Sequence, residues 1–124
     1  MLARSFKTAS ELGVSEIEYS ALLTTLFAFE RGEITNFTMD RFRHACGTPA
    51  CICGWANHLS GGEAFPELDT PSAGRSLFDR LPQNLLVLFD IGYPKNDAAT
   101  IEQAQRALSS YLTTGEPNWV EATA

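Results

Sequence analysis

The chain has 124 residues, of which 44% are hydrophobic and 19% charged, and this is the size and composition of one globular domain. Its formal net charge of −6 excludes a broad phosphate-binding surface, so we expect no nucleic acid as a partner. No stretch approaches the roughly 20 apolar residues of a membrane span. The N-terminus also has no apolar run of the length that a signal peptide needs, so we expect a cytoplasmic protein. Thiols stay reduced in that compartment, and an odd number of cysteines, three, is then not a disulfide framework.

Two capping boxes predict where the longest helices begin. Ser15 and Glu18 form the first, in which a serine cap precedes a glutamate by three residues, and it predicts a helix near 16–31 that Gly32 ends. A short turn of helix is expected before it, stopping at Gly13. The second capping box lies in "TIEQ" (100–103) and predicts a helix that ends at "GEP" (115–117).

Prolines interrupt the helical patterns in the middle of the chain. Residues 33–47 lack a clean period, and Phe37, Met39 and Phe42 are expected to be extended anchors under the helices. Thr48-Pro49 has the form of an N-cap followed by proline at the first helical position, which predicts a helix to about Ser60.

Thr70-Pro71 has the same form and predicts another helix, with Thr70 as its N-cap. Pro82 then breaks or kinks that helix before "QNLLVLFDIG". That last segment is apolar enough to be a buried strand, but we find no convincing hairpin. The sequence therefore predicts an all-α fold, a single irregular bundle of about five helices over residues 1–124. We expect Trp119 to pack back onto the bundle and residues 120–124 to fray.

The segment "HACGTPACICGW" (44–55) holds all three cysteines. If Thr48 caps the helix, Cys51 lies in its first turn, where the helix dipole should lower the pKa of the thiol. Cys53 then points to another side, because i and i+2 positions do not share a helix face. The same helix would offer a small-residue surface, including Gly54, to a neighbouring helix.

This segment is compatible with four functions. A zinc site would use His44, Cys46 and Cys51, but their spacing matches none of the common zinc motifs. A redox pair would use Cys46 and Cys51 across the Gly-Thr-Pro turn. A hydrolase would use Cys51 as nucleophile with His44 or His58 as base. The preferred interpretation is structural, since free cysteine behaves as a small, usually buried hydrophobe.

The segment "CGTPACICGWANHL" also resembles a group of small, uncharacterised bacterial and bacteriophage proteins with a C-G-T-x-x-C-I-x-G-W/H-A signature. The opening "GVSEIEYSALLTTL" (13–26) and the close "TIEQAQRALSSYLTTGEPNW" (100–119) are similar to that group as well. The resemblance implies a bacterial or phage origin and a helical domain, and it implies no activity. Cys53 falls at a variable position of the signature.

These observations predict a small, non-enzymatic interaction or structural module without a cofactor. Its partner is expected to be another protein or a second copy in a homodimer. The alternative is a thiol-redox or metal-binding protein centred on Cys46 and Cys51, with zinc as the metal.

Overall fold

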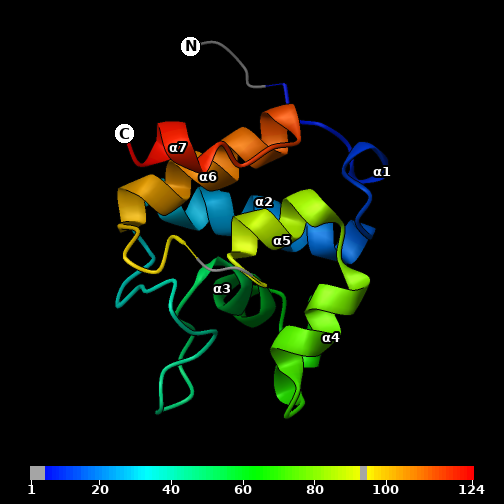
Figure 1. Ribbon diagram of the computed structural model, residues 1–124, viewed down its shortest axis with the longest axis vertical. Helices are drawn as coiled ribbons and strands as arrows, with labels where there is room; N and C mark the ends of the chain where they lie inside the picture. The colour runs from blue at the N-terminus through cyan, green and yellow to red at the C-terminus, as the bar shows by residue number, and fades with distance from the viewer. Residues whose placement is uncertain (1–4, 93–94) are drawn as a thin grey trace.

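The computed structural model describes residues 5–92 and 95–124, and this part of the chain is all-α with no strand (Figure 1). The elements are α1 (Ala9–Leu12), α2 (Glu16–Glu30), α3 (Ile52–Leu59), the 3-10 turn η1 (Pro66–Asp69), α4 (Ala73–Arg80), α5 (Gln83–Phe89), α6 (Ile101–Thr114) and α7 (Trp119–Ala122). The predicted fold class is therefore confirmed. None of the helices in the described residues is long and apolar enough to cross a membrane.

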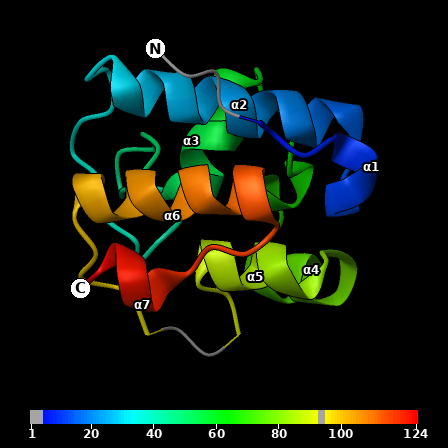
Figure 2. The same cartoon turned by 90° about the horizontal axis from the view of Figure 1, so that it is seen from above.

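The two longest helices, α2 and α6, lie side by side and run in opposite directions (Figure 2). Both begin at the predicted capping boxes, with Ser15 and Thr100 as N-caps. Fully buried leucines line the contact region, among them Leu22, Leu26 and Leu108. Their burial, about 1.5–3 kcal/mol for each such side chain, is the main favourable contribution from this pair of helices.

The C-terminal residues Trp119–Ala122 form the short helix α7, in which Trp119 and Ala122 are buried and Val120 is 85% exposed. The indole Nε1 of Trp119 donates to the carbonyl of Val87 at 2.8 Å, which fixes α7 against α5. Arg106 on α6 donates to the carbonyl of Ala122, whose side chain is buried. These two contacts hold the last helix because they satisfy polar groups on both sides of it.

Residues 38–50 fold back on themselves before α3, and we call this segment the 38–50 loop. Backbone hydrogen bonds join Thr38 to Ala50, Ala50 to Phe42 and His44 to Thr48. Thr48 and Pro49 are therefore paired with the other limb of the loop, and the helix does not begin there. It begins at Ile52, with Cys51 as the N-cap.

The second Thr-Pro prediction also misplaced a helix start. Pro71 precedes α4, which begins at Ala73 after Ser72, and no side chain caps it. The segment after Pro82 is the helix α5 and not a strand, and it ends where Asp90 adopts a left-handed conformation with φ of 61°. Pro82 separates α4 from α5, as predicted.

Arg80 connects α4 to α2 and to η1 through two carboxylates. Arg80 on α4 lies 2.8 Å from Glu18 on α2 and also donates to Glu67 in η1 at 3.1 Å. The Glu18 side chain is only 8% exposed, so without Arg80 its charge would be buried without compensation. The pair to Glu67 lowers the pKa of that carboxyl. This cluster fixes how α4 meets α2.

Candidate functional site

Cys46 lies in the exposed turn of the 38–50 loop. Gly47 has a φ of +90°, a backbone conformation that side chains other than glycine rarely adopt. The Cys46 Sγ lies 3.2 Å from the hydroxyl of Thr48, and this hydrogen bond lowers the pKa of the thiol. Cys46 is therefore an accessible thiol with an increased thiolate fraction.

Cys51 and Cys53 are buried at the beginning of α3, with exposed fractions of 1% and 0%. The Cys51 Sγ accepts a hydrogen bond from the amide of Gly54, so the sulfur caps the helix itself. Burial nevertheless raises the pKa of Cys51 to about 11 and raises that of Cys53 as well. The predicted lowering of the Cys51 pKa is wrong, because desolvation of a thiolate outweighs the helix amides.

The residues considered for metal or redox chemistry differ in burial. Cys46 is exposed in the turn, and Cys51 lies below the base of the same loop in the core. The His44 ring contacts the carbonyl of Asn36 through Nε2. In the described residues, no group of three or more histidine, cysteine, aspartate or glutamate side chains is arranged to hold a metal ion.

Gly54 allows the 38–50 loop to touch α3. A Cβ added there would lie 2.0 Å from the carbonyl oxygen of Phe42. No real Cβ approaches a backbone atom so closely, so only glycine permits this contact. The close approach we expected at Gly54 comes from the backbone of the loop and not from another helix.

A buried amide fastens the loop from its other side. Asn57 on α3 is 2% exposed and donates to the carbonyls of Ala64 and Phe65. Its oxygen accepts from Arg43 at 2.8 Å, and Arg43 also pairs with Asp69 at 2.9 Å. The loop is thereby connected to α3 and to η1 through satisfied polar groups.

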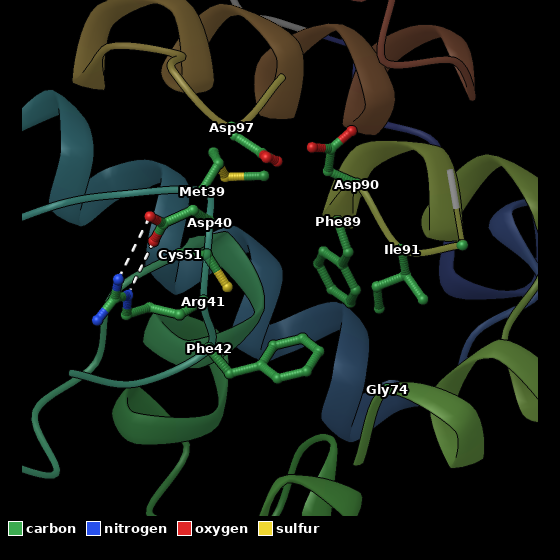
Figure 3. Close-up of a pocket in the computed structure, with 11 residues that line it drawn as sticks. Met39, Asp40, Arg41, Phe42, Cys51, Gly74, Phe89, Asp90, Ile91 and Asp97 are labelled. Carbon is green, nitrogen blue, oxygen red and sulfur yellow. Dashed lines mark hydrogen bonds and ion pairs between the residues drawn. The ribbon is translucent and has the colours of Figure 1, made fainter. Parts of the chain in front are cut away.

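A cleft of about 250 Å³ opens between the 38–50 loop, the beginning of α4 and the end of α5, and we call it the loop cleft (Figure 3). It contains apolar side chains, carboxylates and the buried Cys51. The lining residues are Met39, Asp40, Arg41, Phe42, Cys51, Gly74, Phe89, Asp90, Ile91, Gly92 and Asp97.

Figure 3 shows Phe42, Phe89 and Ile91 around the cavity, with the carboxylates of Asp90 and Asp97 near each other at one side. These aromatic and aliphatic groups offer an apolar surface, and the Asp40–Arg41 pair lies on another side of the cavity from Asp90 and Asp97. Such a combination of an apolar wall with a few polar groups is typical of binding sites.

Some charged side chains of the loop cleft have hydrogen-bond partners within the chain. Arg41 donates to Asp40 at 2.9 Å, which lowers the pKa of Asp40. Asp90 accepts from the backbone amides of Lys95 and Asn96 at 2.9 and 3.0 Å. The neighbouring Asp90 carboxyl raises the pKa of Asp97, because two adjacent carboxyl groups disfavour a second negative charge.

Sequence reasoning identified Met39 and Phe42 as anchors but did not place them at a cleft. The aspartates come from a segment far along the chain, and nothing in their local sequence connects them with the 38–50 loop. Cys51 was a candidate for reactivity and is instead a buried part of the cleft lining.

The fold and this site define an all-α domain with a small, partly apolar cleft beside a buried cysteine pair. Comparison with protein-family models, with curated proteins and with solved structures finds no match to this chain.

Proposed function

We propose that this protein is a small, cytoplasmic, non-enzymatic interaction module that takes up one side chain of a partner protein in the loop cleft. One observation carries the proposal: the cleft presents apolar side chains, among them Phe42, Phe89 and Ile91, beside its charged ones, and it holds about 250 Å³. Pockets for drug-sized ligands span roughly 300–1,000 Å³. The loop cleft is smaller than that range and suits a single side chain.

The surroundings of the cleft support a binding role over a catalytic one. Cys51, the nucleophile that a hydrolase would need, is buried with a pKa of about 11 and is therefore protonated at neutral pH. The proposed function requires no cofactor. The partner is a different protein or a second copy, and the sequence resemblance supports a bacterial or bacteriophage origin.

The test is a titration with capped single amino acids, the N-acetyl amides of leucine, phenylalanine, methionine and lysine, followed by amide chemical shifts. We expect at least one of them to shift the amides of Gly74, Ile91 and Gly92. Gly74→Leu should abolish these shifts, because its side chain would enter the cleft from α4.

The matched control is Arg75→Leu, which adds the same side chain one residue further along α4, at a side chain that is 82% exposed. It should leave the shifts unchanged. The proposal fails if no probe shifts the cleft amides of the unsubstituted protein, or if Gly74→Leu responds as Arg75→Leu does.

A second candidate function is thiol-redox or zinc chemistry centred on Cys46 and Cys51. The observation that favours it is the exposed Cys46 thiol, whose pKa is lowered by Thr48. The burial of Cys51 speaks against its pairing with Cys46. Anaerobic purification followed by metal analysis and thiol counting tests it: one equivalent of zinc, or a Cys46–Cys51 disulfide, would support this alternative.

A further inference from the structure

We propose that a second surface, the groove between α2 and the end of α3, docks a basic amphipathic helix of a partner protein. In the described residues only seven large apolar side chains are exposed, and two of them, Ile17 and Leu59, line this one groove. Ile17 is 50% exposed and Leu59 is 36% exposed. The groove holds about 280 Å³.

The shape of the groove fits a helix. On α2 it follows Ile17, Ser20, Ala21 and Thr24, which are spaced as one face of the helix. From the first to the last of these the helix rises about 11 Å, or two turns. Ser20 and Ala21 have small side chains, so the backbone of a second helix can approach closely between the apolar positions. This matches the recognition of an amphipathic helix in an apolar groove.

The charges of the groove select the partner. Glu16 on α2 and Glu63 after α3 both line the groove and are exposed, and neither has an ion pair within the described residues. Some other exposed carboxylates are paired within the chain, such as Glu33 with Arg31 and Asp79 with Arg75, but neither of these lines the groove. The two free carboxylates therefore complement lysine or arginine beside the apolar anchors of the docking helix.

A second copy of this chain fits the groove less well. The chain carries a net charge of −6, and two copies meeting at this groove would bring Glu16 and Glu63 close to the same carboxylates of the other copy. Unpaired like charges at an interface oppose association. The occupant assigned here is therefore a basic helix of another protein.

The probe is a synthetic amphipathic peptide of 18 residues, a length chosen to span several helical turns, with leucines at i, i+3/i+4 and i+7 and lysines beside them. The matched peptide has glutamate at every lysine position. We expect the lysine peptide to bind at least tenfold more tightly than the glutamate peptide in low salt, by fluorescence anisotropy. It should shift the amides of Ser20, Ala21 and Ser60, and higher salt should weaken the binding.

Two double variants separate the apolar and the charged contributions. Ile17→Ser with Leu59→Ser should weaken the lysine peptide at least tenfold, and Glu16→Gln with Glu63→Gln should weaken it severalfold. Val120→Ser and Glu102→Gln are the controls and should change the affinity less than twofold. Val120 is 85% exposed on α7, and Glu102 lies in the first turn of α6 as Glu16 does in that of α2.

The inference is overturned if both peptides bind equally, if neither binds, or if the shifts map away from the groove. It is also overturned if sedimentation shows a dimer that Ile17→Ser with Leu59→Ser dissociates, since the groove would then belong to a second copy. The glutamate variants and the shift map still decide the matter if the serine variant fails to fold. None of these measurements uses the loop cleft, so they fail independently of the function proposed for it.

Discussion

The two halves of the cysteine segment behave in opposite ways although only four residues separate Cys46 from Cys51. Cys46 lies in an exposed turn, forms a hydrogen bond with Thr48 and has a lowered thiol pKa. Cys51 and Cys53 lie in the core, and burial raises their pKa values. The comparison teaches that the position of a cysteine relative to the core decides its chemistry, and that its position relative to a helix dipole comes second.

The largest expected effect is on the buried half. Gly54→Ala should destabilise the protein by about 3 kcal/mol or more, because the added Cβ would collide with the backbone of Phe42 and neither side can move easily. Urea denaturation measures the loss. Gly74→Ala is the control: its Cβ meets nothing nearer than 4.0 Å, and it should be neutral or stabilise α4 by up to about 1 kcal/mol. Equal behaviour of the two variants would refute the close approach at Gly54.

The next effect is a loss of stability at alkaline pH. The pKa of Cys51 is about 11 in the folded protein, against an ordinary value of 9.0. Below pH 9 the Cys51 thiol is protonated in both the folded and the unfolded state, so this difference in pKa does not change the free energy of unfolding. Between pH 9 and 11 the thiol ionises in the unfolded state but stays protonated in the folded one, so the free energy of unfolding falls by about 2–3 kcal/mol. Tyr111, with its pKa raised to about 12 by burial, adds a further decrease above pH 10.

Unfolding free energies at pH 8, 9, 10 and 11 measure this dependence. Cys51→Ala should make the fall between pH 9 and 11 shallower without abolishing it, because Cys53 and Tyr111 also have raised pKa values, whereas Cys46→Ser should leave the slope there unchanged. A slope that follows Cys46 instead would reverse the comparison between the two halves.

Replacing a cysteine by serine should reduce the stability of the protein by different amounts in the two halves. Cys53→Ser puts a hydroxyl into a fully buried position and should destabilise by about 2 kcal/mol if the hydroxyl finds no partner. Cys46→Ser, at the exposed turn, should stay within about 0.5 kcal/mol of the unsubstituted protein. Thermal unfolding of the two variants side by side gives the answer, and similar melting temperatures would contradict the burial of Cys53.

The smallest effect concerns reactivity. Cys46 should be the one thiol that a disulfide reagent modifies rapidly in the folded protein at pH 7–8, with Cys51 and Cys53 reacting only on unfolding. Thr48→Val removes the hydroxyl that stabilises the Cys46 thiolate and should slow this reaction severalfold at pH 7. An unchanged rate would mean that Thr48 does not set the thiol pKa, and rapid modification of three thiols would show that the core is open.

The sequence predicted the elements whose signals are local. Both capping boxes marked true helix starts, because a serine or threonine and a glutamate or glutamine three residues later satisfy each other's amides without help from the rest of the fold. The all-α class followed from those helices. Thr48-Pro49 misled us since the same two residues serve equally well in the paired limb of a loop, and only the contact with Phe42 decides between them.

The candidate site depended on contacts that no local pattern shows. Asp90 and Asp97 lie far from the 38–50 loop in the sequence and line the same cleft in the fold. Their place at the cleft therefore depends on tertiary packing and not on a local pattern. Glu18 was read as a capping residue and proved also to be the buried partner of Arg80, 62 positions along the chain. Nothing in the local sequence marks Asn57 as the residue that holds two backbone carbonyls.

The two tryptophans give the molecule a pair of built-in optical reporters. Trp55 is the last residue of the cysteine segment, and its ring packs edge-on against that of His58, with ring centroids 5.9 Å apart. Trp119 is held against α5 at the far end of the sequence. Single-tryptophan forms, made by replacing either one with phenylalanine, would let fluorescence follow the loss of structure around α3 and around α7 separately, so that the order in which the two regions come apart can be timed.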